Sequence, residues 1–293
     1  MWRRKGLKLG RVVITTKKTA YEHYREDNTL EGMPEDERGE IEERYIDHFS
    51  TLERVKDCLE NMGISYQIRK VPSNEDITQN VDLVISVGGD GTVLNTAHKL
   101  KGVPLLPVRA DGKSHGALCT SNIDSLESIL EDVKGGEEER IKWTRLEFKG
   151  DNIEGRALNE IFIGRKYSTG VARYIISKGG LSEEHMNSGL VISTGAGSTG
   201  WYSNISGNYG SFPRNSRESR FIVRESIRDN EQKLNEGILR EGENLQVKSK
   251  MNVGGVISLD GNTKERLYEF PRGKLISLKI SDYPLKVIRG GEY

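Results

Sequence analysis

Short apolar runs alternate with amphipathic segments in the first half of the chain, and the two patterns predict strands and helices respectively. The runs rich in Val, Ile and Leu lie at residues 9–16, 64–71, 81–87 and 103–108. The segments with an apolar residue at every third or fourth position lie at residues 45–62, 93–100 and 126–133. This β-α-β-α order predicts an α/β domain with a parallel sheet over residues 1–134.

The pattern changes after Gly135-Gly136, where strand-like segments recur at short intervals. They lie at residues 140–149, 155–163, 171–178, 189–193, 245–250, 255–260 and 275–280. Asp151-Asn152 favours a hairpin turn between the first two. Helical periodicity is weak and confined to residues 217–235. Residues 135–293 are therefore predicted to form a mainly antiparallel, β-sandwich-like domain.

The composition limits the classes of partner that the protein is expected to bind. The 293 residues suit two domains, and 44 Lys and Arg balance 44 Asp and Glu. A net charge of zero disfavours binding to nucleic acid or to an anionic membrane through overall charge. No apolar run approaches the roughly 20 residues that span a bilayer. Cys58 and Cys119 are interpreted as reduced thiols.

Charge is unevenly distributed along the chain. Residues 1–18 carry seven basic side chains and no acidic ones, a composition also typical of a transit peptide. The predicted strand at 9–16 leaves little room for a removable leader, so we expect a cytoplasmic protein. Residues 22–60 hold 14 acidic and 5 basic side chains, a net of −9. Within this stretch, Glu31–Gly39 is predicted to be a loop.

The strongest chemical signal is Val87-Gly-Gly-Asp-Gly-Thr-Val-Leu94, between a buried strand and the start of a helix. Open α/β sheets bind ligands at such positions. Gly88, Gly89 and Gly91 let the backbone approach phosphates, and the first N–H groups of the helix attract anions. Asp90 either accepts a hydroxyl proton during phosphoryl transfer or caps the helix.

Two further segments carry weaker signals. Asn159 and Glu160 interrupt an apolar strand, either to bind ribose hydroxyls and an amine or as an edge pair facing water. The second segment is a glycine-rich loop that suits a nucleotide or forms a sharp turn. It contains Thr194, Gly195, Gly197, Ser198 and Thr199, and is followed by Trp201.

Together these segments resemble the NAD kinase family. Gly88–Thr92 matches its G-G-D-G-T motif, Asn159-Glu160 its N-E/D pair, and residues 194–199 its T-P-T-G-S-T loop. Ser258-Leu-Asp-Gly261 is similar to a late acidic-Gly turn. The resemblance covers roughly residues 11–288.

Several departures indicate the divergent, mitochondrial-type branch of that family. Gly195 replaces a proline, Gly200-Trp201 replaces alanine-tyrosine, and Ser188 stands where an acidic residue is common. Val108–Cys119 replaces another glycine-containing stretch. Residues 16–22 and 45–49 also resemble the divergent branch.

The resemblance implies an NAD kinase-like fold and phosphorylation of the adenosine ribose 2′-hydroxyl of NAD by ATP with Mg²⁺. It assigns proton acceptance to Asp90 and phosphate binding to Gly88, Gly89, Gly91 and Thr92. The dinucleotide would contact Asn159, Glu160 and the loop that contains Thr194, Gly195, Gly197, Ser198 and Thr199. Trp201 would stack on a base or belong to the core. Nucleotides are the implied partners, and a homo-oligomer is expected.

Several other polar residues fit more than one role. Arg109, Asp111 and His115 follow a parallel strand and suit a substrate loop, although His115 also fits a solvated loop histidine. The histidines and cysteines show no metal-ligand spacing, so the metal would arrive with nucleotide phosphates. A basic stretch suits donor phosphates or a solvated helix face. It comprises Arg214, Arg217, Arg220, Arg224 and Arg228.

Two alternative functions share the same motifs. The G-G-D-G-T element also occurs in kinases that phosphorylate a lipid or sugar hydroxyl, and a non-catalytic nucleotide sensor would use the same residues. The Asn159-Glu160 pair favours the dinucleotide over a lipid, and Asp90 favours an enzyme over a sensor.

Overall fold

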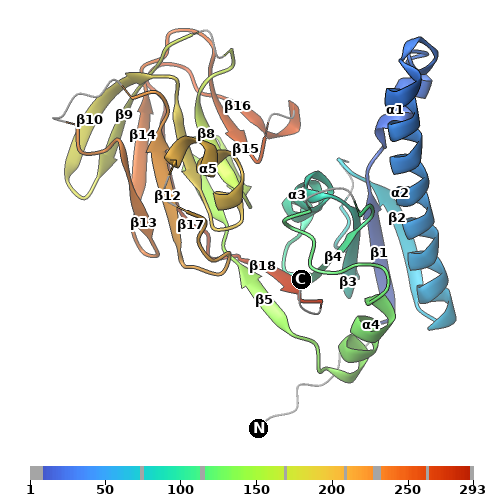
Figure 1. Ribbon diagram of the computed structural model, residues 1–293. Coiled ribbons are helices and arrows are strands. Elements are labelled where there is room, and N and C mark those ends of the chain that lie inside the picture. Colours follow the sequence, from blue (N-terminus) through green and yellow to red (C-terminus); the bar gives the residue numbers. More distant parts are fainter. Residues whose placement is uncertain are drawn as a thin grey trace. The chain divides into compact units, whose positions relative to one another are not determined.

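The computed structural model describes most of the chain and divides it into two compact units. The described residues are 9–72, 76–112, 116–167, 170–207, 210–226, 232–261 and 264–290. Unit 1 comprises residues 1–141 and 285–293, and unit 2 comprises residues 142–284. Both are shown in Figure 1, and each is treated by itself.

Unit 1 is built on a six-stranded sheet with the order β2-β1-β3-β4-β18-β5. Its strands are β1 (Arg11–Thr16), β2 (Ser65–Lys70), β3 (Leu83–Gly88), β4 (Leu105–Arg109), β5 (Arg140–Trp143) and β18 (Leu285–Ile288). Its helices are α1 (Ala20–Glu26), η1 (Leu30–Gly32), α2 (Glu35–Asn61), α3 (Asp90–Lys99) and α4 (Leu126–Gly135). The β1, β2, β3, β4 and β18 pairings are parallel. The predicted α/β architecture is therefore confirmed.

Burial explains why this sheet forms. Every residue of β3 is buried, as expected for a central parallel strand covered on both faces. Val55 and Leu59 of α2 and Leu130 of α4 are fully buried in the same core as Ile85. The long helix α2 packs against β2 and β3, and it runs beside β2 in Figure 1.

Unit 2 is a sandwich of two antiparallel six-stranded sheets, as the sequence predicts. One sheet has the order β10-β9-β14-β17-β6-β7, and the other β13-β12-β11-β8-β15-β16. The first contains β6 (Leu146–Gly150), β7 (Glu154–Ala157), β9 (Ala172–Lys178), β10 (Leu181–Asn187), β14 (Leu245–Ser249) and β17 (Leu275–Ile280). The second contains β8 (Glu160–Arg165), β11 (Leu190–Ser193), β12 (Glu218–Val223), β13 (Glu236–Arg240), β15 (Gly255–Leu259) and β16 (Leu267–Glu269). Short helical turns η2 (Gly197–Thr199), α5 (Trp201–Ser206) and η3 (Lys264–Arg266) complete the unit.

Strand alternation places the core between these sheets. Ile161 and Ile163 of β8 are fully buried in the sandwich core. The intervening Phe162 instead packs with Tyr202 and Trp201 of α5 on the opposite face of its sheet. Phe162 and Trp201 also line a cavity on that face.

The division into units differs from the predicted boundary at 134/135. The first unit extends to Ile141, and residues 285–293 return to it although they were assigned to the second domain. The reason is that Val287 and Ile288 are fully buried, and Val287 pairs with Leu105 of β4. Residues 285–288 are mostly apolar, and burying their side chains in the parallel sheet of unit 1 removes apolar surface from water.

Two local predictions were wrong. Residues 217–235 do not form a helix where described: β12 covers residues 218–223, because Phe221 and Val223 alternate into the sandwich core. Arg228 lies outside the described residues. The predicted loop at Glu31–Gly39 contains the start of α2, where Glu35, Asp36 and Glu37 occupy the first turn. Acidic side chains are favourable there because the helix N-terminus carries partial positive charge.

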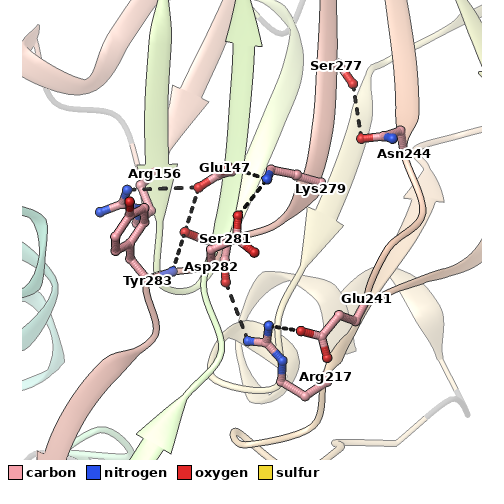
Figure 2. A network of polar contacts seen from close by, with 10 residues as sticks. All are labelled: Glu147, Arg156, Arg217, Glu241, Asn244, Ser277, Lys279, Ser281, Asp282 and Tyr283. Carbon is pink, nitrogen blue, oxygen red and sulfur yellow. Dashed lines mark hydrogen bonds and ion pairs between the residues drawn. The ribbon is translucent and has the colours of Figure 1, made fainter.

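A polar network fixes the segment by which the chain leaves β17 (Figure 2). The Ser281 hydroxyl donates to a Glu147 carboxylate oxygen at 2.7 Å, and Lys279 lies 3.3 Å from the other oxygen of Glu147. Asp282 pairs with Lys279 at 2.8 Å. The Tyr283 ring lies under the Arg156 guanidinium, 4.9 Å from its central carbon. Neighbouring strands of unit 2 therefore hold residues 281–283 through several directed contacts (Figure 2).

None of the helices within the described residues is long and apolar enough to cross a membrane.

Candidate functional site

The Gly88–Thr92 segment forms the turn between β3 and α3. A Cβ atom on Gly88 would collide with the Thr92 hydroxyl and would lie 2.7 Å from Thr92 Cβ, so the turn requires glycine there. Gly89 is the N-cap residue, and Gly91 is exposed with no atom within 4 Å of an added Cβ. Thr92 Oγ1 is buried without a hydrogen-bond partner. A buried hydroxyl of that kind is costly unless a ligand satisfies it.

Asp90 does not cap its own helix, which overturns the structural interpretation of this residue. Its carboxylate instead accepts the backbone N–H of Leu118 at 2.8 Å and that of Ala117 at 3.2 Å. These contacts hold the carboxylate at the first turn of α3. They orient a half-buried carboxylate that the first turn of α3 does not use as a cap.

The predicted substrate loop lies beside the same turn. Arg109 ends β4, and its guanidinium donates to the Gly116 carbonyl at 3.4 Å. The Ala110 N–H donates to the Gly88 carbonyl at 3.3 Å. Asp90 and Arg109 are therefore both anchored on residues 116–118. His115 lies outside the described residues.

Asp111 faces a different cavity of unit 1. That cavity has a volume of about 420 Å³ and is also lined by Lys17, Arg44 and His48. His48 Nε2 lies 2.7 Å from the Thr16 hydroxyl. Burial lowers the pKa of His48, with a further contribution from Lys17, while Glu22 and Asp111 act in the opposite direction. No local sequence pattern groups these residues.

In unit 2, Asn159 directly precedes the central strand β8 and Glu160 begins it, which excludes the interpretation of an edge pair facing water. Asp260 accepts the backbone N–H groups of Leu158 at 2.8 Å, Asn159 at 2.6 Å and Glu160 at 3.0 Å. Asn159 Oδ1 is buried and has no hydrogen-bond partner. One buried carboxylate thus fixes the backbone of the pair and leaves the Asn159 side chain for another group.

Glu160 occupies an unusual electrostatic position. Burial, followed by the nearby Asp260 carboxylate, raises the pKa of Glu160 to about 8, although Arg266 acts in the opposite direction. A pKa raised in this direction favours the protonated form of the Glu160 side chain at neutral pH. Burial also lowers the pKa of Arg145 to about 10, with Arg156 adding to this effect and Asp260 opposing it.

The glycine-rich loop is built directly on the Asn159 segment. The Thr194 hydroxyl donates to the Leu158 carbonyl at 2.5 Å, and the Thr194 N–H donates to the Asn159 carbonyl at 2.8 Å. A Cβ on Gly197 would lie 2.5 Å from the Asn159 carbonyl oxygen. The structure therefore brings these two motifs together, although Thr194 lies 35 residues after Asn159 in the sequence.

The loop residues differ in what they leave accessible. Gly195 allows close approach to the Pro213 backbone, where a Cβ would collide. The Ser198 hydroxyl donates to the Gly195 carbonyl at 2.8 Å and is buried. Thr199 is exposed, and Trp201 is half-buried against Phe162 with ring centroids 5.2 Å apart. Most of this loop therefore supports its own backbone, and Thr199 and Trp201 present side chains to solvent.

Comparison with known proteins accounts for the pairing of these motifs. The family model for the ATP-NAD kinase N-terminal domain matches residues 18–137. A probable NADH kinase from Oryza sativa subsp. japonica is 28% identical over 276 residues, covering 85% of this chain and 83% of that protein. The chain therefore resembles the NAD kinase family over most of its length.

Two further comparisons agree with this resemblance, one in sequence and one in fold. The human mitochondrial NAD kinase 2 is 28% identical over 263 residues, covering 68% of this chain and 59% of that protein. The match to the human protein thus spans under two thirds of its length. The crystal structure of an NAD kinase from Archaeoglobus fulgidus in complex with ATP superposes with a TM-score of 0.69 at 16% identity, covering 96% of this chain and 94% of that one. The relation to the NAD kinase family, including its mitochondrial-type branch, is confirmed.

Several residues beside these motifs are not predicted as site residues from the sequence. Asp260 belongs to the family-like turn Ser258–Gly261, and no local pattern connects it to Asn159 across 101 residues. Arg145, Arg266 and His48 were not singled out as site residues. Within the described ranges, no group of three or more His, Cys, Asp or Glu residues is placed to hold a metal ion. Both Asp90 oxygens already accept backbone N–H groups.

Proposed function

We propose that this protein is an NAD kinase that transfers the γ-phosphoryl group of ATP to the adenosine ribose 2′-hydroxyl of NAD, giving NADP and ADP. The observation that carries the proposal is the placement of Asp90. A carboxylate in a glycine-rich, anion-binding turn is repulsive to phosphates unless it has a chemical task. Here it is oriented by Ala117 and Leu118 and does not serve as a helix cap.

Asp90 would act as the general base. As the 2′-oxygen bonds to the γ-phosphorus and the bond to the ADP oxygen breaks, the hydroxyl proton passes to the Asp90 carboxylate. Positioned general bases contribute about 10²–10⁴-fold to rate. Most of the remaining catalysis in phosphoryl transfer comes from positioning and from electrostatic stabilisation.

The turn around Asp90 would hold phosphate oxygens. Gly88, Gly89 and Gly91 keep the backbone at the start of α3 open, where the N–H groups carry partial positive charge. The buried Thr92 hydroxyl would donate to an oxygen of the same ligand. Mg²⁺ would enter bound to the ATP phosphates, since it usually binds through substrate phosphates and only one or two carboxylates. It would neutralise charge on the transferred group.

In unit 2, Asn159 and Glu160 would contact the dinucleotide. The unpartnered Asn159 Oδ1 accepts a hydrogen bond from a hydroxyl or an amine. A protonated Glu160 donates one hydrogen bond and accepts another, which an ionised carboxylate cannot do. Thr194, Gly195, Gly197 and Ser198 shape the adjoining backbone, and Thr199 offers an exposed hydroxyl.

An acceptor assay tests the function directly. Purified protein with NAD, ATP and Mg²⁺ is expected to form NADP, measured with an NADP-specific dehydrogenase. Other nucleoside triphosphates and polyphosphate are assayed in parallel, together with NADH. If no donor gives NADP while circular dichroism shows a folded protein, the proposed function is wrong. A panel of lipid and sugar hydroxyls with labelled ATP then tests the alternative kinases.

Two further expectations come from the sequence and the family resemblance. We propose a homo-oligomer and a cytoplasmic location for this chain. Light scattering coupled to size-exclusion chromatography measures the first, and fractionation of the source cells measures the second. A mass of 32.9 kDa at micromolar concentration contradicts the oligomer.

A further inference from the structure

The strand β10 lies at one edge of its sheet and turns an unusual set of side chains toward the interior of the sandwich. Glu183, His185 and Asn187 alternate along its inner side, where they are buried or half-buried. The inner positions of a β-sandwich usually form an apolar core. Inward-facing polar residues on an edge strand discourage pairing with another chain. The contacts of these three side chains decide whether they do more than that.

Glu183 ties this edge to the other sheet of the sandwich. Its two carboxylate oxygens accept the backbone N–H groups of Lys233 at 3.0 Å and Leu234 at 2.8 Å. These two residues precede β13, which is an edge strand of the second sheet. The Leu234 side chain is buried in the sandwich core. The carboxylate thus links the two edges and helps to close the core, and we call this pair of contacts the Glu183 clasp.

His185 lies between two residues that have partners and makes no hydrogen bond itself. Asn187 Oδ1 accepts the Tyr174 hydroxyl and the Gly189 N–H, each at 2.7 Å. The His185 side chain is 1% exposed, and neither Nδ1 nor Nε2 has a hydrogen-bond partner among the described residues. The Tyr174 ring stacks on the imidazole with centroids 5.8 Å apart. A buried imidazole with two unmade hydrogen bonds is costly, so this position calls for a physical explanation.

The Glu183 carboxylate lies close to this imidazole. His185 Nε2 is 3.7 Å from Glu183 Oε2, beyond hydrogen-bond distance, and the same oxygen accepts the Leu234 N–H. Burial lowers the pKa of His185, while the charge of Glu183 acts in the opposite direction. The closed edge therefore favours the neutral imidazole.

Other described charges on the surrounding elements are directed away from His185. Glu184, the next residue along β10, pairs with Lys250 at 2.5 Å on the outer side of the strand. The remaining charged side chains of the neighbouring segments are exposed. They are Arg173 of β9, Lys248 of β14, and Lys233 and Glu236 of the facing edge. Glu183 is thus the charged group that titration of His185 affects first.

We propose that protonation of His185 opens the Glu183 clasp, so that acid releases this edge of unit 2. A buried imidazolium needs an acceptor, and the Glu183 oxygen within reach is the one that holds Leu234. If the carboxylate turns to His185, the Leu234 N–H loses its acceptor. If His185 turns to solvent, the inner side of β10 moves with it. Either movement separates Lys233 and Leu234 from β10, and neither depends on the proposed kinase activity.

The direction of the pH dependence follows from the burial of His185. Because the closed edge lowers the pKa of His185 below its ordinary value of 6.5, the open edge takes up a proton more readily. The stability of the closed edge is fully present above about pH 6.5 and is lost as the pH falls below that value. Each pH unit changes the ratio of open to closed molecules by at most about tenfold.

Hydrogen exchange at the amides of Lys233 and Leu234 tests the proposal, because these N–H groups are the donors of the clasp. Exchange in the full chain is measured by NMR at pH 7.5 and pH 5.5 and corrected for the intrinsic rate at each pH. Protection of both amides in the wild type is expected to fall by about threefold to tenfold in acid. Equal protection at the two pH values, or greater protection at pH 5.5, overturns the proposal.

Variants at His185 separate its titration from other effects of acid. His185→Phe retains a ring that stacks on Tyr174 and removes the titrating group, so protection of the two amides should be independent of pH. His185→Met is the second variant if phenylalanine unfolds the protein, and thermal unfolding checks each one. The matched control is His23→Gln, which removes an exposed histidine of α1 and should keep the wild-type response. A wild-type acid response in folded His185→Phe contradicts the proposal.

Two further readouts distinguish local opening from a general loss of structure. The amides of β14, which pairs with a strand on either side, should keep their protection at pH 5.5. An equal loss of protection there would show global unfolding and would contradict an opening confined to this edge. Glu183→Gln removes the charge that two N–H groups share, so protection of Lys233 and Leu234 should fall at least about threefold already at pH 7.5. Unchanged protection in Glu183→Gln would show that the clasp does not hold this segment.

Discussion

The two units present their key carboxylates in opposite ways. Asp90 in unit 1 is half-buried and is oriented by two backbone N–H groups from residues 117 and 118. Asp260 in unit 2 is buried and accepts three backbone N–H groups from residues 158–160. Beside it, Glu160 is buried with a pKa raised to about 8. One unit therefore holds a half-buried acid at the turn proposed to bind phosphates, whereas the other uses a buried acid to fix backbone.

Under the proposed function, the carboxylate of Asp90 takes part in the chemical step, and the carboxylate of Asp260 positions a binding segment. The turn of unit 1 depends on contiguous small residues that leave room for a ligand. The corresponding segment of unit 2 depends on a distant carboxylate that stabilises a strand start in a buried, partly charged environment. Substitutions should consequently affect turnover in the first case, and folding together with affinity in the second.

The glycines of the first turn provide the largest expected contrast. Gly88→Ala forces a Cβ against Thr92, so the free energy of unfolding should fall by about 1–3 kcal/mol and NADP formation should be lost. Gly91→Ala meets no atom within 4 Å and should fold normally. Urea unfolding and the NADP assay measure both variants. A fully stable and active Gly88→Ala protein would show that the turn tolerates a side chain.

Asp260→Asn should weaken unit 2. The amide keeps one acceptor oxygen but loses the charge that three N–H groups share, so the free energy of unfolding should fall by about 1.5–3 kcal/mol. The affinity for NAD should fall about tenfold while Asp90 chemistry, measured as kcat at saturation, changes less. The reverse pattern, with kcat lost and the Michaelis constant unchanged, contradicts a positioning role.

Glu160→Gln tests the protonation of the buried acid. Because folding raises the pKa of Glu160 from 4.5 to about 8, the folded state binds the extra proton between those values. The associated stability is fully present below pH 4.5 and is lost as pH rises through about 8. Wild-type stability should therefore decline across this window relative to Glu160→Gln, by at most about 1.4 kcal/mol per pH unit. Denaturant unfolding from pH 5 to pH 8 measures the difference, and parallel curves contradict a raised pKa.

The smallest effect is expected from Thr92→Val. This change removes a buried hydroxyl that has no partner, so stability should be unchanged or should rise by up to about 1 kcal/mol. NADP formation should nevertheless fall about tenfold, because a donor to the ligand is lost. Thr92→Ser, which retains the hydroxyl, serves as the control. Equal activity of the valine and serine variants would show that the hydroxyl does not contact the ligand.

Local sequence was sufficient where the site is contiguous. The position of Gly88–Thr92 between a buried strand and a helix predicted both the turn and the acid within it, since period and glycine spacing act over a few residues. It was insufficient where partners are distant: the Asp260 contacts join positions 101 residues apart, and strand pairing alone creates them. Residues 217–223 were assigned a helical tendency because polar residues obscured the alternation that buries Phe221 and Val223.

The most direct test of the account is NADP formation by Asp90→Asn compared with the wild type. Asparagine retains the shape of the side chain but cannot accept the hydroxyl proton, so turnover should fall about 10²–10⁴-fold. Binding of NAD and ATP, measured by calorimetry, should remain within about threefold of the wild type. A variant that binds both substrates and turns over at the wild-type rate would contradict the role assigned to Asp90.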